Sequence, residues 1–410
     1  MLMSPYLRKL SRLEAPTALE WLIYFTAFLV LHIPGIINFY SNDGVNNPYL
    51  LFAQSLLHGH LTLPEMSSYG DMINYQGSYY LPYPPLPSII LMPFVAIFGT
   101  GHVNTVLIAL IMTCINFYLM HKIFLKLQIK QSYFPWLIMA FFLGTGYWYA
   151  LFTSHHVYSF AHITSCMFQL LFLNEILGKR RWLLIGAYLG CTFLTRQFTF
   201  FYIVFAFGYM WYLQQQKQEK TSISNVLKLI GAFGIFAGFY LIYNYLRFHN
   251  PFDTGYSHIV FIGALKERVS QFGVFSPKYF LFNLYSFFIK GFNIEFQGNT
   301  LLHIKDMDLW GTSLLSASPF FIASLKANWP KPLKISAWIT VGLILIGTLF
   351  YHNNGYHQVN TMRFSLDFLP LLLLLTALGF KQIPAWLMKG MIVYAVLLNL
   401  ISFLIHSLYQ

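Results

Sequence analysis

The chain has 410 residues, of which 57% are hydrophobic and 19% are aromatic, but only 9% are charged. A soluble domain carries about 25% charged residues because its surface faces water, so this composition excludes an ordinary soluble protein. The net charge of +12 fits the Lys and Arg that collect in the cytoplasmic loops of membrane proteins, and no nucleic acid partner is expected.

Apolar segments near the length needed to cross a bilayer, about 20 residues, recur along the whole chain. The first is too long for the apolar core of a signal peptide and is interpreted as a retained signal anchor. The pattern predicts an all-α polytopic membrane protein, with residues 1–410 forming a single transmembrane domain of about 11 helices. The expected spans are 18–39, 102–121, 133–151, 157–177, 182–195, 197–213, 226–246, 309–325, 335–351, 366–380 and 386–406.

Lys and Arg indicate the orientation, because both are enriched on the cytoplasmic side of a membrane. With the N-terminus in the cytoplasm, most of them fall in inner loops, for example in 122–130, 179–181 and 326–334. The apolar segment 279–289 is short, so we expect an interfacial helix there. If that segment crossed the membrane instead, the orientation of everything after it would invert.

Two long outer segments interrupt this pattern of spans. Residues 38–102 contain no Lys or Arg, and residues 247–308 are mixed in charge and rich in aromatic side chains. Long ordered loops usually carry function, so the working face is expected to be the outer one. The stretch 48–57 predicts an amphipathic helix lying in the outer interface.

Asp43 follows the first span at the expected membrane surface and has no basic neighbour in sequence. A partly desolvated carboxylate in that place has a raised pKa and is suited to act as a general base. The alternative is a structural role, in which Asp43 caps the N-terminus of the helix that follows.

Asp71 begins a second candidate segment, which continues through Tyr75 and Tyr80 to the prolines at 84, 85 and 87. Tyrosine rings and hydroxyls suit the binding of sugars, whereas the prolines favour an extended backbone. The alternative is a rigid loop with aromatic residues at the membrane interface.

Arg196, Arg247 and Arg363 are cations at the outer ends of expected spans. A guanidinium group at membrane depth normally faces a cavity and has a partner, and it binds phosphate through two parallel hydrogen bonds. For Arg247 and Arg363, pairing with Asp253 or Asp367, or extension towards lipid headgroups, is the structural alternative.

His155 and His156 are adjacent, and His162 lies on a similar helical face. Their spacing is not a known zinc pattern, so no metal is expected; interfacial histidines and hydrogen bonds to substrate are the remaining interpretations. The sequence contains no motif of a soluble nucleotide-binding domain and none for a cofactor.

In order and spacing, four stretches resemble the integral-membrane C-type glycosyltransferases, which share the GT-C fold. The similarity is to the bacterial branch that includes the protein O-mannosyltransferase and lipid A aminoarabinose transferase families. A second acid normally accompanies the first-loop acid in that family, but Asn42 and Gly44 flank Asp43 here. The stretches are SNDGVNNPYLLFAQSLLHG, DMINYQGSYYLPYPPLPSIILMPFVAIFG, YNYLRFHNPFDTGY and MRFSLDFLPLLLLL.

The resemblance implies a bundle of membrane helices with interfacial helices in the first outer loop. It also implies a polyprenyl-phosphate sugar donor, inversion at the anomeric carbon and a lipid, glycan or protein acceptor. Asp43 matches the family's general base, the Asp71 stretch would shape the sugar pocket, and the outer arginines would hold the donor phosphate. The location implied is the bacterial inner membrane, with the active face outward.

Two other interpretations remain open. A transporter or flippase for a lipid-linked or small polar solute would place charges near the middle of the membrane, and Arg196 is the residue that favours it. A scaffold that keeps the fold without catalysis is the other.

Overall fold

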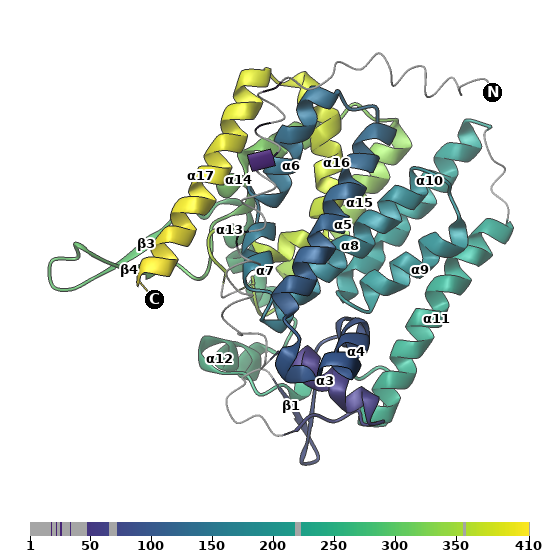
Figure 1. Ribbon diagram of the computed structural model, residues 1–410, viewed down its shortest axis with the longest axis vertical. Helices are drawn as coiled ribbons and strands as arrows, with labels where there is room; N and C mark the ends of the chain where they lie inside the picture. The colour runs from purple at the N-terminus through teal and green to yellow at the C-terminus, as the bar shows by residue number, and fades with distance from the viewer. Residues whose placement is uncertain are drawn as a thin grey trace.

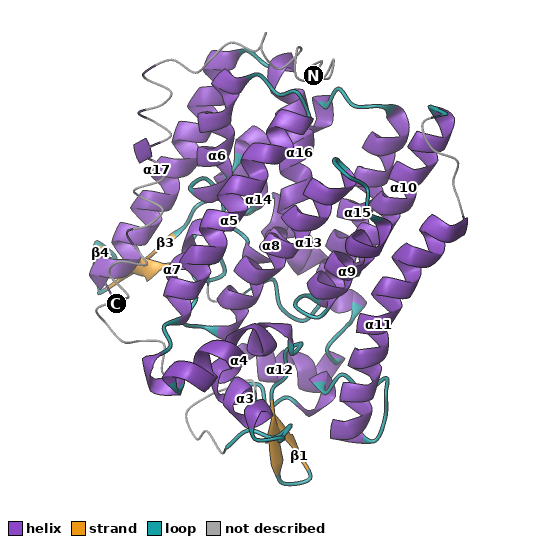
Figure 2. Ribbon diagram, turned by 45° about the vertical axis from the view of Figure 1, so that its right-hand side comes forward, coloured by secondary structure: helices purple, strands orange, loops and turns teal. Residues whose placement is uncertain are grey.

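A computed structural model describes residues 47–64, 72–217, 223–355 and 358–409, together with a few isolated positions before residue 47. Asp43, Asp71 and most of the expected first span lie outside the described residues. Figure 1 shows a bundle in which most long helices run roughly along the vertical axis, and Figure 2 shows how little of it is strand.

Within the described residues, four helices are long and apolar enough to cross a membrane. At 1.5 Å per residue, the shortest of them is about 28 Å long, close to the thickness of a bilayer's hydrocarbon core. They are α5 (Thr105–Lys126), α11 (Ile223–Phe248), α15 (Lys331–Leu349) and α17 (Ala385–Tyr409).

Helix α8 (Val157–Ile176) has 20 residues, and several expected spans contain a 3-10 segment. The shorter α-helices are α3 (Pro48–Leu57), α4 (Leu86–Phe98), α6 (Phe134–Phe142), α7 (Tyr147–Phe152), α9 (Trp182–Phe193), α10 (Tyr202–Gln215), α12 (Gly263–Phe272), α13 (Phe280–Phe288), α14 (Leu314–Ala317) and α16 (Leu369–Gly379). The 3-10 segments that matter below are η3 (Gln197–Phe201), η6 (Pro319–Lys326) and η7 (Arg363–Asp367).

The expected span 133–151 is interrupted between α6 and α7. A Cβ atom at Gly144 would lie 2.8 Å from the carbonyl oxygen of Ala140, so the backbone turns where only glycine fits. Asn399 of α17 donates hydrogen bonds to the carbonyls of Leu143 and Thr145, at 2.7 and 3.1 Å. The break is therefore stabilised by a side chain from the C-terminal helix.

The expected span 309–325 is likewise not one regular helix. It contains α14 and η6, with the break at Ser318, immediately before Pro319. Proline cannot donate the backbone hydrogen bond that would continue a helix. Gly379 allows α16 to pack directly on η6, because a Cβ atom there would lie 1.8 Å from the Ala323 carbonyl oxygen.

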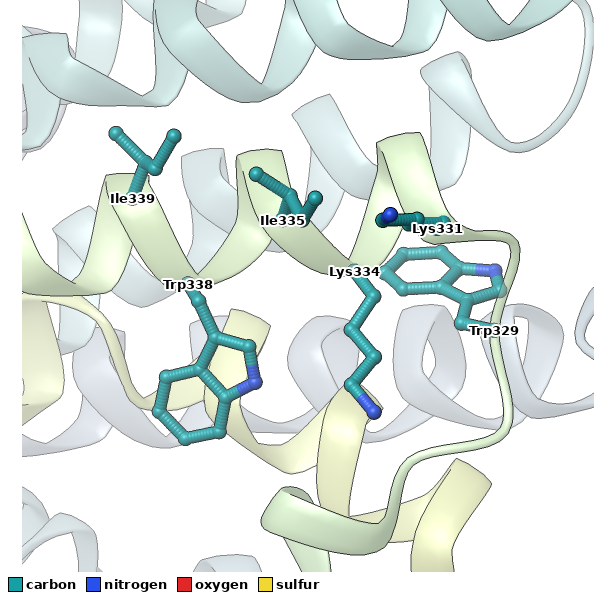
Figure 3. Close-up of a pocket in the computed structure, with 6 residues that line it drawn as sticks. All are labelled: Trp329, Lys331, Lys334, Ile335, Trp338 and Ile339. Carbon is teal, nitrogen blue, oxygen red and sulfur yellow. The ribbon is translucent and has the colours of Figure 1, made fainter.

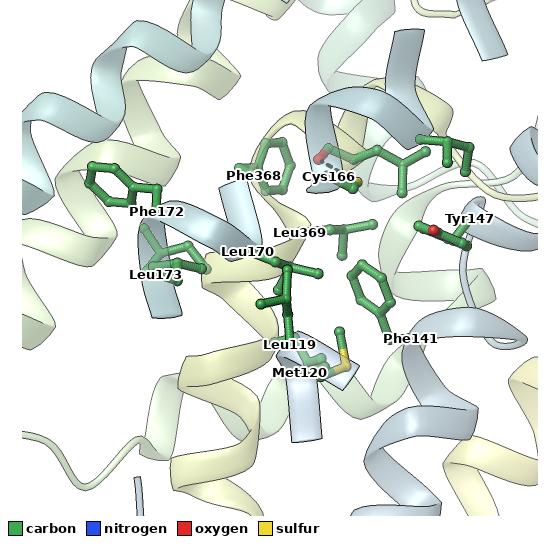
Figure 4. Close-up of a cluster of buried hydrophobic side chains, with 14 of the residues drawn as sticks. Leu119, Met120, Phe141, Tyr147, Cys166, Leu170, Phe172, Leu173, Phe368 and Leu369 are labelled. Carbon is green, nitrogen blue, oxygen red and sulfur yellow. Dashed lines mark hydrogen bonds between the residues drawn. The ribbon is translucent and has the colours of Figure 1, made fainter. Parts of the chain in front are cut away.

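One large apolar core runs through the bundle, and α8 lies near its centre (Figures 1 and 2). Helix α8 packs between α5 and α9, and α9 in turn packs on α11. Figure 4 shows part of this core, in which side chains of α5, α6 and α8 meet those at the start of α16. By contrast, α11 carries exposed apolar side chains such as Ile235 and Ile242, as expected for a helix that faces lipid.

The elements of the first outer loop gather at one end of the molecule, at the bottom of Figure 1. The helix predicted over 48–57 is present as α3, and its N-cap is Asn47, whose side chain accepts a hydrogen bond from the Tyr49 amide at 2.9 Å. The capping role that the sequence allowed for Asp43 is taken at this helix by Asn47. The resemblance implied further helices in this loop without giving their positions; α4 begins at Leu86, with Pro87 in its first turn, where proline is tolerated.

Strands β1 (Ile73–Tyr75) and β2 (Ser78–Tyr80) form an antiparallel hairpin in the same loop. Its turn residues, Gln76 and Gly77, both have positive φ, as the tight turns that match strand twist require. The second outer segment joins it, because the Val260 amide donates to the Met72 carbonyl at 3.0 Å. The two long outer loops therefore form one layer.

Within the second outer segment, α13 has nine residues, about 14 Å of helix, which is too short to span a bilayer. Strands β3 (Ile294–Gln297) and β4 (His303–Met307) follow as a second antiparallel hairpin. The structure thus agrees with the expected short helix over 279–289.

Candidate active site

A cluster of charged side chains is buried where α8, the start of η3 and η7 meet. Arg196 donates hydrogen bonds to both carboxylate oxygens of Asp367, from Nε at 3.0 Å to Oδ1 and from Nη2 at 2.8 Å to Oδ2. His162 Nδ1 lies 3.3 Å from Asp367 Oδ1. The side chains of Asp367 and His162 are 1% and 0% exposed, whereas that of Arg196 is 17% exposed, so the cluster reaches the surface through the arginine.

Arg363 lies beside this ion pair. Its guanidinium carbon is 3.8 Å from the centre of the Tyr158 ring, and its Nε donates to the Gly355 carbonyl at 3.0 Å. The Phe364 ring lies between the two arginines, 5.1 Å from the Arg196 guanidinium and 5.3 Å from that of Arg363. Two guanidinium groups from distant parts of the chain therefore meet in one place.

Arg196 is placed by the break between α9 and η3. Its amide donates to the Thr192 carbonyl at 2.7 Å, closing the last turn of α9. The Leu86 amide at the start of α4 donates to the Leu194 carbonyl at 3.1 Å. The proline-rich part of the first outer loop is therefore attached directly to the turn that carries Arg196.

Asp367 and Arg363 are placed by η7. Cys166 and Gln169 of α8 both contact the Leu366 carbonyl, at 3.6 and 3.3 Å, which fixes the residue before Asp367. The Gln358 side chain accepts a hydrogen bond from the Arg363 amide at 2.8 Å. The backbone around both charged groups is therefore held by polar contacts inside the core.

Arg247 has a different environment at the end of α11. It donates to the Leu81 carbonyl and to the Asn244 side chain, at 2.9 and 2.8 Å, and its guanidinium lies 3.8 Å from the centre of the Tyr243 ring. It therefore joins the first outer loop to α11. Asp253, the partner considered for it, contacts His258 at 3.0 Å.

Tyr75 and Tyr80 lie on the same face of the β1–β2 hairpin and both contact Phe248. Their ring centres are 5.3 and 5.4 Å from that of Phe248 at the end of α11, and Tyr75 also lies 4.8 Å from His258. Two of the stretches that carry the family resemblance therefore pack on each other.

His155 and His156 lie in the turn before α8, with their ring centres 4.1 Å apart. The chain just after Asp43 reaches this turn, since Asn47 Nδ2 donates to the Ser154 carbonyl at 3.4 Å. Among the described residues, no group of three or more His, Cys, Asp or Glu is arranged to hold a metal ion.

Sequence reasoning had considered Asp367 as the partner of Arg363, but the structure pairs it with Arg196. It missed Tyr158 and Phe364, whose rings contact the arginines. The available signal was spacing: Tyr158 and His162, like Arg363 and Asp367, are four residues apart, as neighbours on a helical turn are.

The cluster brings charged groups of both signs together. Arg196 and Arg363 contribute two guanidinium groups, and the Asp367 carboxylate pairs with Arg196. Inserting an arginine at the centre of a membrane costs about 2.5–3.5 kcal/mol on insertion scales, and such residues mark functional sites. The arrangement is suited to receive an anion next to the arginines.

No family model matches this sequence, and no curated protein matches it. Among solved structures, the crystal structure of ArnT from Cupriavidus metallidurans bound to undecaprenyl phosphate superimposes on 91% of this chain with a TM-score of 0.51. The chain has an ArnT-like fold. Sequence identity is 12%, and the matched region is 62% of the ArnT chain, so the ArnT-like part spans less than two thirds of that protein.

The ArnT-like fold confirms the expected fold class. An all-α bundle of apolar helices with a layer of loops at one end is what the resemblance to the GT-C glycosyltransferases implied. Together with the four helices long enough to span a bilayer, the fold identifies a membrane protein.

Proposed function

We propose that this chain is a membrane glycosyltransferase that moves a sugar from a polyprenyl-phosphate donor to an acceptor hydroxyl. Arg196 and Arg363 would hold the donor phosphate, and Asp43 would act as the general base. The acceptor would be a hydroxyl group of a lipid, a glycan or a protein. The reaction would take place on the outer face of the bacterial inner membrane, with the N-terminus in the cytoplasm.

The observation that carries this proposal is the buried cluster in which the guanidinium groups of Arg196 and Arg363 lie beside the Asp367 carboxylate. Arginine binds a phosphate monoester or diester through paired, charge-assisted hydrogen bonds. The solved ArnT structure with a similar fold has undecaprenyl phosphate bound, which supports the same class of ligand here.

Covalent geometry supports the role of Asp43. Its Cα lies at most about 14 Å from that of Asn47, because each residue spans no more than about 3.6 Å. Asn47 contacts the Ser154 carbonyl in the turn before α8, and α8 carries both Tyr158 and His162. Asn47, four residues after Asp43, thus lies near the helix whose side chains contact Arg363 and Asp367, which supports the proposed role of Asp43.

In the proposed reaction, the acceptor oxygen attacks the anomeric carbon from the side opposite the phosphate. A new carbon–oxygen bond forms while the bond from that carbon to the phosphate oxygen breaks, so the configuration inverts. The electron pair leaves with polyprenyl phosphate, whose charge the arginines stabilise. The acceptor proton passes to the Asp43 carboxylate, and such general-base catalysis contributes about 10²–10⁴-fold.

Tyr75, Tyr80, His155 and His156 would border the sugar and acceptor side, with Asp71 in the same loop. Arg247 would contribute by holding the first outer loop on α11, since its hydrogen bonds go to Leu81 and Asn244. The buried position of Arg196, which had favoured a transporter, is accounted for by its pairing with Asp367.

The test measures sugar transfer in membranes supplied with a polyprenyl-phosphate sugar and a candidate acceptor. We expect Asp43→Asn to lower turnover by about 10²-fold or more while the protein remains inserted. We expect Arg363→Gln to weaken donor binding, because a neutral amide does not balance the phosphate charge.

Glu267→Gln is the matched control, since Glu267 is an exposed acid on α12 in the same outer layer; its turnover should equal that of the wild type. Wild-type turnover in Asp43→Asn would remove the base assignment. Unchanged donor affinity in Arg363→Gln would remove the phosphate assignment.

A further inference from the structure

A second feature lies at the opposite end of α15 from the outer loops. It is a surface groove with a volume of about 600 Å³, lined by Trp329, Lys331, Lys334, Ile335, Trp338 and Ile339. We call it the α15 groove. Figure 3 shows that Lys334 and Trp338 extend to the same side of α15, while Ile335 and Ile339 project from a different side of the helix.

The groove is distant from the charged cluster. Helix α15 has 19 residues, about 28 Å of helix. The residues just beyond its far end are joined to the second outer segment. The Ser276 amide donates to the Phe350 carbonyl, and the His352 amide donates to the Val274 carbonyl. The groove lysines lie in the first turn of α15, about one hydrocarbon-core thickness from the outer layer, and the lining extends along the helix to Ile339.

Its lining combines the chemical features of a phospholipid site. Lys331 is exposed and Lys334 is half-buried, and within the described residues neither forms an ion pair with an acidic side chain. Trp329 and Trp338 supply the indole rings that sit at headgroup depth in membranes. Ile335 and Ile339, at 46% and 47% exposure, present an apolar surface four residues apart.

We propose that the α15 groove binds an anionic phospholipid, with the headgroup phosphate between the two lysines and an acyl chain against the isoleucines. Charge complementarity selects an anionic headgroup, because each lysine near a membrane surface favours anionic lipid. The exposed isoleucines favour a lipid over a soluble phosphate, because a soluble phosphate has no apolar group that would pack on them. The lipid would be bound on the face opposite the proposed active site.

The test uses native mass spectrometry of the full chain in a mild detergent, titrated with phosphatidylglycerol or with phosphatidylcholine. We expect the wild type to bind phosphatidylglycerol about tenfold more tightly, and Lys331→Gln/Lys334→Gln to lose about tenfold in that affinity. The control Lys217→Gln/Lys228→Gln removes two exposed lysines near the same end of the molecule, outside the groove, and should bind like the wild type. Circular dichroism confirms that each variant keeps its helices.

Three outcomes overturn the proposal. One is equal affinity of the wild type for the two lipids, and another is a phosphatidylglycerol preference that survives in the groove variant or falls equally in the control. The third is full displacement of phosphatidylglycerol by millimolar inorganic phosphate, which would indicate a site for a soluble anion.

Discussion

The Arg196–Asp367 pair permits a quantitative test of how the cluster is held together. The hydrogen bonds of the pair are charge-assisted, and Asp367 is 1% exposed. Removing one partner of a buried ion pair costs about 3–5 kcal/mol, because the other charge remains buried without compensation. Arg196 is 17% exposed, so water can reach it, and we expect about 3 kcal/mol for Asp367→Asn.

The assay is a double-mutant cycle on Asp367→Asn and Arg196→Gln, with unfolding in mixed micelles followed by tryptophan fluorescence. The double variant should be less destabilised than the sum of the single variants, with a coupling energy of about 2 kcal/mol or more. The Lys305–Glu295 pair of the β3–β4 hairpin serves as a control, because its side chains are 57% and 41% exposed and exposed pairs contribute about 0–1 kcal/mol. A coupling energy for the buried pair no larger than that of the control would refute the reasoning.

Two further predictions concern packing and pH. Gly186→Ala would place a Cβ atom 2.3 Å from the Leu229 carbonyl oxygen where α9 packs on α11, so we expect about 1–3 kcal/mol of destabilisation. In the control Gly231→Ala, the new Cβ atom has nothing within 4 Å, so this variant should be neutral or slightly stabilising. Equal free energies of unfolding for the two variants would contradict this packing. Burial, opposed by a backbone hydrogen bond with Val274 and aided by the charge of Arg268, lowers the pKa of His352 from 6.5 to about 4. The unfolded chain then binds the proton first, so this contribution to stability is present above pH 6.5 and is lost as pH falls towards 4, by on the order of 1 kcal/mol per pH unit. His352→Phe, which keeps an aromatic contact with Phe261, should show a flatter decline of unfolding midpoint between pH 6.5 and 4 than the wild type, and an unchanged decline would argue against a neutral His352.

Composition and hydropathy were sufficient to predict a helical membrane protein, because the length of an apolar run is set directly by the thickness of the bilayer. They were not sufficient to predict where helices break. The interruption at Gly144 depends on the carbonyl of Ala140 and on Asn399, which is more than 250 residues away along the chain, and no local pattern contains that contact.

The same distinction applies to the candidate site. Arg196 stood out because inserting a guanidinium group into a membrane costs free energy, and an arginine in an apolar stretch is visible in the local sequence. Its partner is 171 residues away, and either Asp253 or Asp367 was available to pair with an arginine on charge alone. Asp367 is the partner because η7, whose backbone is held by contacts from α8, places its carboxylate next to Arg196. Nothing in the sequence singled out Tyr158, because its contact with the Arg363 guanidinium exists only in the fold.

The Asn399 side chain joins two separate parts of the bundle through its hydrogen bonds. Its carbonyl oxygen accepts hydrogen bonds from Asn360 and Thr361, at 2.7 and 3.1 Å, while its amide donates to the interrupted helix. One neutral side chain near the end of the polypeptide thus ties together the approach to Arg363 and the α6–α7 corner. A shift of α17 would therefore move the backbone before Arg363 and the α6–α7 corner together, although this helix is not part of the charged cluster.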